Sequence, residues 1–222
     1  MKLQKKDFIE IKFTAKIKDG EIFDSNIQKD IEKINPEIKA KSFVFCLGEE
    51  MFLKSVEDFL IGKEIGKYKI ELSPENAFGK RNPALIQKIP KKVFIEHKLN
   101  PIPGVIFNFD GRVAKVLTSS GGRVIVDFNN PIAGKEVIYE LEVVKKIEDI
   151  KEKIKSLNEF FFRKNFDSEV KDKKLLMSVE KPYVQFVELF KEKFKEILDL
   201  DLEIKEIEMP KKSNSETPKT SQ

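Results

Sequence analysis

Seven aromatic residues and one acid, scattered between positions 13 and 139, are the residues whose types could build a binding site. They are Phe13, Phe23, Phe43, Phe45, Phe52, Phe78 and Tyr139, with Asp24 directly after Phe23. Leu53 and Val56 follow Phe52 at a spacing that suits one helix face. Rings of this kind bind an apolar group and exclude water, and they need no nucleophile. A single ring of this kind usually fills a hydrophobic core, whereas the whole set favours a groove, so both interpretations stay open.

Nucleophilic and metal chemistry have few candidate residues. The sequence contains one cysteine, Cys46, and one histidine, His97. Cys46 lies in the apolar run 43–47, which predicts a buried structural thiol, because a reactive cysteine needs exposure and a nearby base. One histidine among lysines cannot assemble a metal cluster or a Cys–His pair. We therefore expect no metal, no cofactor and no covalent mechanism.

The amino-acid composition argues against some classes of binding partner. The chain has 222 residues, of which 40% are hydrophobic and 36% charged, with a net charge of +4. Lysines and acids are spread through every segment, so we expect no nucleic-acid partner. The N-terminus lacks the apolar core of a signal peptide, and no run approaches the roughly 20 apolar residues that span a bilayer. We expect a cytoplasmic protein without a membrane partner.

The first eighty residues predict a sheet packed on one helix. Every odd position from Ile9 to Ile17 is apolar and the even positions between them are polar, which indicates a half-buried strand, and Asp19-Gly20 indicates a turn into a second strand. Residues 25–40 predict a long loop or a short helical connection. Apolar residues at three- and four-residue spacing predict a helix over 52–60. Further strands are expected at 41–47, 68–72 and 137–143.

A different segment interrupts this pattern between 73–80 and 127–134. It contains three predicted strands, at 105–109, 113–117 and 123–128, joined by the turn signals Asp110-Gly111 and Ser119-Ser-Gly-Gly122. Its apolar residues exceed what one face of a small sheet can bury, so some are expected to bind a substrate chain. They are Ile86, Ile89, Phe94, Ile106, Phe107 and Phe109. A compact core is the alternative.

After Ile147 the pattern changes to a small α+β unit. Helices are predicted at 148–164 and 182–198, and strands at 175–179 and 202–207. The tail 210–222 is rich in Ser, Thr, Lys and Pro and predicts disorder. The helices carry enough apolar surface for a homodimer contact through Phe186, Val187, Phe190 and Phe194.

The order of the motifs resembles the FKBP-type peptidyl-prolyl cis-trans isomerases. The shared stretches are Phe13-Thr14, Phe23-Asp24-Ser25, Phe43-x-Phe-x-Leu-Gly48, Phe52-Leu-Lys-Ser-Val-Glu57, Pro74-Glu-Asn-Ala-Phe-Gly79 and Tyr139-Glu-Leu-Glu142. The insertion that starts after Gly79 and is closed by the run 127–134 is similar to that of the SlyD subgroup, in which a β-rich domain in the flap acts as a chaperone site. The extra C-terminal unit is similar to that of long-chain archaeal members.

The resemblance implies an α+β fold with an antiparallel half-barrel on one short helix and an apolar pocket for a prolyl ring. Phe13 and Phe78 depart from it, because tyrosine is usual at both positions and the hydroxyl at 78 can hydrogen-bond a substrate carbonyl. Val56 stands where some relatives carry tryptophan. Asp24 either orients neighbouring side chains or faces the substrate carbonyl, and the alternative is a loop acid that caps backbone amides. The implied pocket residues are Phe13, Phe23, Asp24, Phe43, Phe52, Leu53, Val56, Phe78 and Tyr139, with Ile132 beside them.

We thus predict four parts: an isomerase domain of residues 1–82 and 130–147, an inserted chaperone domain of 83–129, a C-terminal α+β domain of 148–209 and a disordered tail. The predicted activity is prolyl isomerisation in unfolded or nascent polypeptides, aided by capture on the inserted domain. A holdase with weakened catalysis is the alternative, because Phe13 and Phe78 lack hydroxyls.

Overall fold

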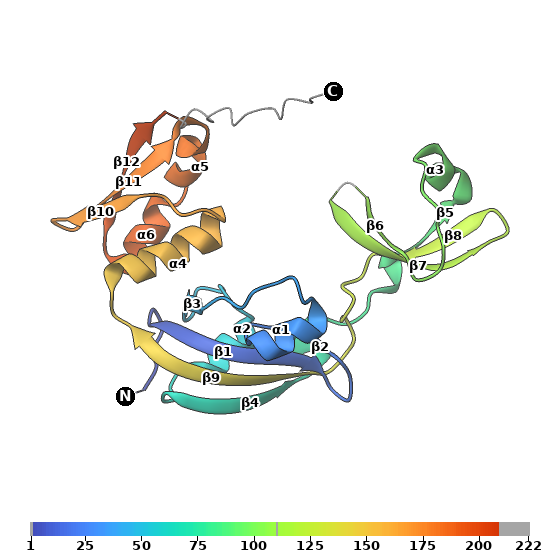
Figure 1. The fold of residues 1–222 in the computed structure, drawn as a ribbon, viewed down its shortest axis with the longest axis horizontal. Helices are drawn as coiled ribbons and strands as arrows, with labels where there is room; N and C mark the ends of the chain where they lie inside the picture. Colours follow the sequence, from blue (N-terminus) through green and yellow to red (C-terminus); the bar gives the residue numbers. More distant parts are fainter. Residues whose placement is uncertain (1, 110, 209–222) are drawn as a thin grey trace, which may run out of the picture.

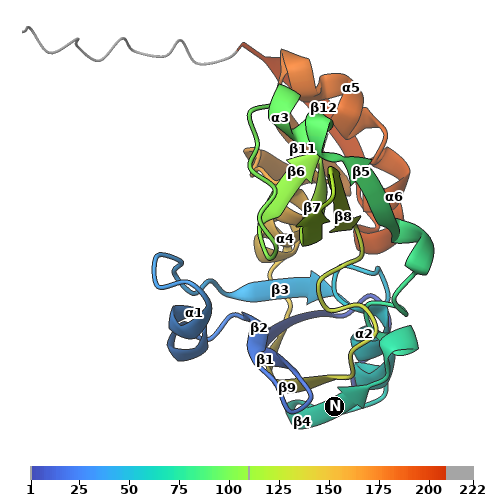
Figure 2. The same ribbon diagram turned by 90° about the vertical axis from the view of Figure 1, so that its right-hand side faces the viewer.

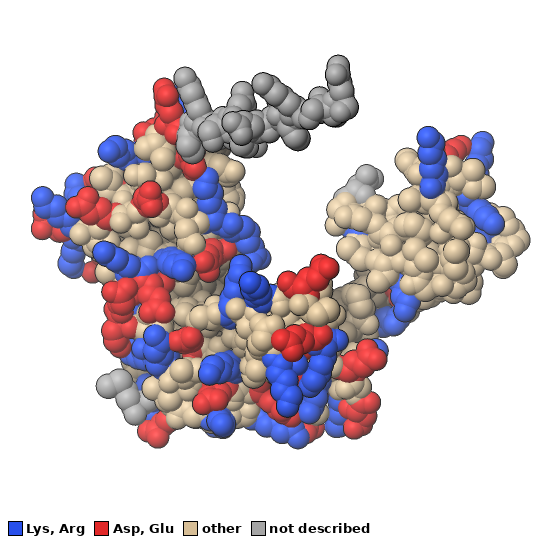
Figure 3. Space-filling model, viewed as in Figure 1, with Lys and Arg blue, Asp and Glu red and all other residues tan. Residues whose placement is uncertain are grey.

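The computed structural model describes residues 2–109 and 111–208, and the predicted disordered tail lies outside them. Figure 1 shows a central body with one arm rising on each side, and Figure 2 shows the same arms above the body from a second direction. In Figure 3 an open cleft separates the arms, and side chains of both charge signs are interspersed over the body. Helices and mostly antiparallel sheets make up the described chain, which confirms the α+β class.

The central body is a five-stranded sheet packed on a short helix. Strand β1 (Phe8–Ile17) pairs along its length with β9 (Val137–Ile147), and β4 (Gly66–Leu72) pairs with the other edge of β9. The second edge of β1 is shared by β2 (Ile22–Ser25) and β3 (Phe43–Cys46). Helix α2 (Lys54–Leu60) buries Val56 and Leu60. All pairings are antiparallel, as the alternating residues predict.

A side-chain amide fills the gap between β2 and β3 along β1. Asn26 accepts the backbone N–H of Phe13 at 2.8 Å and donates to the carbonyl of Ile11 at 2.7 Å. The predicted connection 25–40 contains the helix α1 (Gln28–Ile34), and Thr14 donates its hydroxyl hydrogen to Asp30 of that helix at 2.8 Å. The connection is therefore anchored beside Phe13.

The segment between β4 and β9 forms one arm with its own four-stranded sheet. Its strands are β5 (Ile86–Pro90), β6 (Ile106–Phe109), β7 (Arg112–Ser120) and β8 (Arg123–Asp127), in the spatial order β5-β8-β7-β6, with the helix α3 (Lys91–Glu96) after β5. The short 3-10 turns Pro74–Asn76 and Pro83–Leu85 precede it. The three predicted strands are present. Strand β5 was not predicted, because the prolines in its segment argue against a strand.

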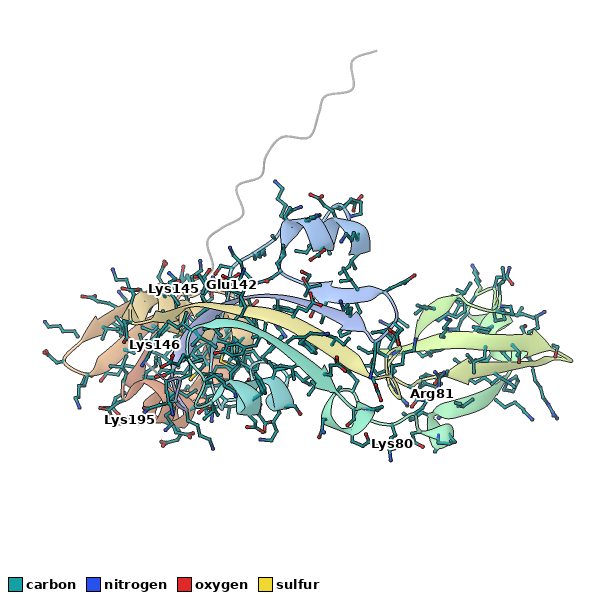
Figure 4. All side chains as sticks on the ribbon, turned by 90° about the horizontal axis from the view of Figure 1, so that it is seen from below. Lys80, Arg81, Glu142, Lys145, Lys146 and Lys195 are labelled. Atoms are coloured by element: carbon teal, nitrogen blue, oxygen red, sulfur yellow. The ribbon has the colours of Figure 1, made fainter. Side chains whose placement is uncertain are left out.

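The two connections between the body and this arm are hydrogen-bonded to each other. The side chain of Asn129 accepts the N–H of Asn82 at 2.8 Å and donates to the Asn82 carbonyl at 3.0 Å. Arg81, labelled in Figure 4 where the chain leaves the body, forms an ion pair with the buried Asp127. The N–H of Gly134 donates to the carbonyl of Gly79 at 2.8 Å. The two ends of the arm therefore lie side by side.

The other arm is the C-terminal unit. It contains α4 (Ile150–Phe162), β10 (Ser168–Lys171), β11 (Lys174–Glu180), a 3-10 turn (Lys181–Tyr183), α5 (Val184–Glu188), α6 (Lys191–Leu198) and β12 (Asp201–Ile207), with β12 parallel to β11. The prediction of one helix over 182–198 was wrong, because the four-residue spacing of its phenylalanines continues across the break at Leu189-Phe190. The predicted partner face was also wrong in two members, since Val187 and Phe194 are fully buried.

Helix α4 packs against the central body. The hydroxyl of Ser156 donates to the carbonyl of Val44 in β3 at 2.6 Å, and Ile154 and Leu157 are buried in the same apolar core as β1. The C-terminal unit thus shares a core with the central body.

Candidate functional site

The predicted rings come together in the central body. We call Phe13, Phe23, Phe43, Phe45, Phe52, Phe78 and Tyr139 the ring cluster. Centroids lie 5.0 Å apart for Phe13 and Phe52, 5.7 Å for Phe52 and Tyr139, and 5.6 Å for Phe23 and Phe78. Most of these pairs meet edge to face, the geometry that aromatic quadrupoles favour.

Strands and loops from distant parts of the chain position the cluster. Ala15 of β1 is directly opposite Tyr139 of β9, which places Phe13 and Tyr139 on one face of the sheet with centroids 6.4 Å apart. Phe23 lies in β2 and Phe43 in β3. Phe52 lies in the loop before α2.

A hollow of about 610 Å³ opens beside the cluster. Four of the predicted pocket residues line it, namely Phe13, Asp24, Phe43 and Phe52. The others do not line it: Phe23, Phe78 and Tyr139 contact neighbouring rings, Leu53 is half-buried at the start of α2, and Val56 is fully buried. The rings therefore form both a core and the wall of an indentation.

Asp24 is the acid at this wall. The residue as a whole is exposed, yet burial of its carboxyl group raises the pKa, and a hydrogen bond from the N–H of Ser25 lowers it in part. Burial and the charge of Asp24 both raise the pKa of Tyr139, so its hydroxyl remains a protonated donor near that carboxylate.

Sequence comparison places this arrangement in a family. The family model of the FKBP-type peptidyl-prolyl cis-trans isomerases matches residues 1–99 of this chain. The short-type peptidyl-prolyl cis-trans isomerase of Methanocaldococcus jannaschii is 30% identical over 146 residues, which cover 64% of this chain and 92% of that protein. The chain belongs to the FKBP-type peptidyl-prolyl cis-trans isomerases.

Other relatives agree with this assignment. An FKBP-type 16 kDa peptidyl-prolyl cis-trans isomerase of Escherichia coli is 28% identical over 148 residues, covering 64% of this chain and 92% of its own. SlyD of Pasteurella multocida, an FKBP-type isomerase, is 28% identical over 149 residues, covering 65% and 69%. The family of the FKBP26 IF domain matches residues 87–132, which include β6, β7 and β8.

A buried acid of this FKBP-type isomerase was missed by the sequence analysis. Glu57 of α2 is 1% exposed and accepts backbone N–H groups from Gly48 at 2.7 Å, Glu50 at 3.2 Å and Phe52 at 2.7 Å. It fixes the loop that carries Phe52. The one available signal in the sequence was that Glu57 lies in an amphipathic helix. At such a position the pattern predicts either an apolar residue or a solvated acid.

Ile132 is half-buried and is not among the residues that line the hollow. It is in the turn after β8, where its N–H donates to the side chain of Asn130 at 3.0 Å. Among the described residues it belongs to neither apolar core.

The apolar residues predicted to bind substrate in the arm of this FKBP protein differ in exposure. Ile106 is 58% and Ile86 37% exposed, whereas Ile89, Phe107 and Phe109 are half-buried. Phe94 is fully buried, with its ring 5.8 Å from Phe107 and 5.5 Å from Phe109, so it is a core residue and not a contact surface. Four further apolar residues of the arm are exposed and were not in the predicted set, namely Ile95, Ile102, Val105 and Val113.

Cys46 is a structural thiol in this isomerase. Its side chain is fully buried, and burial raises its pKa to about 12. Within residues 2–109 and 111–208 no group of three or more His, Cys, Asp or Glu side chains is placed to hold a metal ion. None of the helices described is long and apolar enough to cross a membrane.

Proposed function

We propose that a prolyl residue binds in the hollow beside the ring cluster and that the preceding amide lies near Asp24. The observation that supports this most directly is that Phe13, Phe43 and Phe52 line the same hollow as Asp24. The ring wall accepts the pyrrolidine, and the partly buried carboxyl group of Asp24 belongs to the same lining.

Such a hollow suits the rotation of a prolyl amide. The barrier of about 18 to 20 kcal/mol arises because resonance is lost in the twisted geometry. A twisted amide has less charge separation than a planar one, so an apolar surrounding favours the transition state over the ground state. A thousandfold acceleration needs roughly 4 kcal/mol of such preference.

We further propose that the arm of residues 83–129 captures unfolded or nascent chains for a catalytic domain of residues 1–82 and 130–147. β6 is an edge strand of its sheet, and Ile106 on it is 58% exposed. Ile102 and Val113 beside this strand are 53% and 54% exposed. An edge strand with exposed apolar side chains can add an extended chain as a further strand.

Deletion of Pro83 to Asn129 tests whether the arm captures substrate chains while the central body catalyses the isomerisation. Asn129 hydrogen-bonds both backbone groups of Asn82, so the cut ends lie close together and a short Gly-Ser linker can join them. We expect the deletion to keep most turnover of a Leu-Pro or Phe-Pro tetrapeptide and to slow proline-limited refolding of a protein substrate strongly, because capture raises the local concentration of prolines. Undiminished refolding activity would contradict capture.

A point variant separates capture from loss of structure. Ile106→Ser removes an exposed side chain, and Asn108→Ser changes the next exposed residue of the same strand as a matched control. We expect only Ile106→Ser to weaken binding of an unfolded protein, measured by suppression of its aggregation.

A further inference from the structure

The hollow beside the ring cluster continues to the C-terminal arm. One wall consists of Phe13, Phe43 and Phe52, and the opposite wall is one side of α4. The segment before β3 contributes further lining residues. The residues from these two further elements are Ile38, Lys39, Lys41, Ser42, Glu152, Lys155, Ser156, Glu159, Phe160 and Arg163.

The α4 wall is held in place by core packing. Ser156 is 6% exposed and donates to the carbonyl of Val44 at 2.6 Å, which ties α4 to the strand that carries Phe43. Leu157 is fully buried in the core of the central body. A chain bound at the ring cluster therefore meets a preformed second surface.

This second surface carries cations without ion-pair partners. Four basic side chains line the hollow, Lys39, Lys41, Lys155 and Arg163, and none of them has a carboxylate partner in the part of the chain that the structure describes. Figure 3 shows Lys and Arg side chains gathered where the C-terminal arm meets the central body.

These four cations outnumber the two acids on the same side of the hollow, Glu152 and Glu159, and the third acid of the lining, Asp24, lies beside the rings. Glu152 lies 3.9 Å from the Nζ atom of Lys145, and Glu159 accepts a hydrogen bond of 3.0 Å from Asn165. The side of the hollow that α4 and the segment 38–42 form therefore offers positive charge to a ligand. Ile38 and Phe160 supply apolar surface between these charges.

We propose that this side of the hollow is a subsite for an acidic side chain near the prolyl residue of the client chain. The proposal deepens the proposed function and rests on the prolyl ring binding at the ring cluster. An extended chain advances about 3.3 Å per residue, so a glutamate a few positions from the proline reaches α4. Arg163 can bind its carboxylate through two parallel N–H groups, and Lys155 adds a second positive charge. The subsite selects which prolines are bound and leaves the chemistry of rotation unchanged.

Matched peptides test the subsite. In an eight-residue Leu-Pro peptide, Glu is placed in turn at each position on either side of the Leu-Pro unit, and each peptide is compared with its Gln counterpart using the full chain. We expect KM to be about fivefold lower for Glu at one or two positions, with kcat nearly unchanged, because the added contact binds ground and transition states alike. The preference should shrink as salt is raised.

Charge reversal identifies the residues responsible. Lys155→Glu with Arg163→Glu should abolish or invert the preference, while Lys171→Glu with Lys205→Glu, exposed positions on β10 and β12 outside the hollow, should keep it at the same net charge. The Gln peptide reports on folding, since its turnover should be equal in both variants. Equal KM for Glu and Gln at every position, or a preference that survives reversal, would overturn the subsite alone. Failure to turn over the Gln peptide in wild type would overturn the prolyl site and the subsite together.

Discussion

The carboxylate of Glu57 accepts a hydrogen bond of 2.7 Å from the backbone N–H of Phe52, a ring that lines the hollow. Its other oxygen accepts the N–H groups of Gly48 and Glu50. One buried side chain thus closes the loop between β3 and α2 and places a wall of the site.

We predict that Glu57→Gln lowers the free energy of unfolding by about 2 kcal/mol, because its NH₂ group would face backbone N–H donors and leave them unpaired. Displacement of Phe52 should also lower kcat/KM for a tetrapeptide. Denaturant unfolding measures the first effect, with Asp58→Asn, an exposed acid of the same helix, as the control. Equal stability of the two variants would contradict this role.

The stability of the protein should depend on pH through Glu57. Burial raises its pKa, and the N–H groups of Phe52, Gly48 and Glu50 lower it only in part. Between the unfolded and the higher folded pKa the folded state binds more protons, so the unfolding free energy falls as pH rises through that window. We expect this decrease, above the ordinary pKa of a glutamate, in wild type and its absence in Glu57→Gln. Urea midpoints from about pH 4 to about pH 7 measure it.

Asp24→Ala should reduce catalysis more than stability. Asp24 is exposed, so its loss should change the unfolding free energy by less than about 1 kcal/mol, while kcat/KM falls about tenfold. Because the pKa of Asp24 is raised, we expect the kcat/KM of wild type to fall as pH is lowered through that pKa. The kcat/KM of Asp24→Asn should show no such fall. Glu21→Ala in the adjacent hairpin is the control. Wild-type rates in Asp24→Ala would refute the assignment.

Tyr139→Phe should slow isomerisation severalfold, by about 1 kcal/mol in the barrier. Tyr139 is the member of the ring cluster that carries a hydroxyl, and within the described residues no hydrogen bond occupies that group. Its protonated hydroxyl lies near the Asp24 carboxyl group, which lines the hollow, so its loss should change how that carboxyl group meets the substrate. Cis-to-trans kinetics of a Leu-Pro peptide measure the rate. Identical rates in wild type and Tyr139→Phe would show that the hydroxyl has no such role.

Local patterns predicted much of the fold. Alternation in β1, β4 and β9 and the apolar face of α2 appear in the sequence, because each strand or helix exposes one side. β10 was missed because all four of its residues are exposed and give no alternation. The break between α5 and α6 was missed because Phe186, Phe190 and Phe194 keep helical spacing across it.

The aromatic residues of the candidate site could be predicted from the sequence, but the polar side chains that hold its loops could not. Motif order indicated that Phe13, Phe52 and Tyr139 belong together. Asn26 and Glu57 hold backbone groups of other segments, and such contacts leave no periodicity. The α4 wall depends on Ser156 meeting Val44, 112 positions away in the sequence.

The C-terminal arm should carry the homodimer contact that we propose, on an exposed apolar patch formed by Tyr183, Phe186 and Leu189, which are 40%, 46% and 78% exposed. A second copy of the chain could cover exposed apolar side chains of this kind in a self-complementary contact. Truncation after Ile147 is a poor test, because it would uncover the core that α4 shares with the central body.

Leu189→Asp in the full chain tests the patch directly, because a charge at the centre of a self-complementary contact is buried on both subunits. Light scattering should give twice the chain mass for wild type and the chain mass for Leu189→Asp. Val170→Asp, which changes an exposed valine on β10 of the same unit, should remain dimeric. A monomeric wild type, or a dimer that tolerates Leu189→Asp, would exclude this patch, since no isologous contact through Leu189 could accept two facing carboxylates.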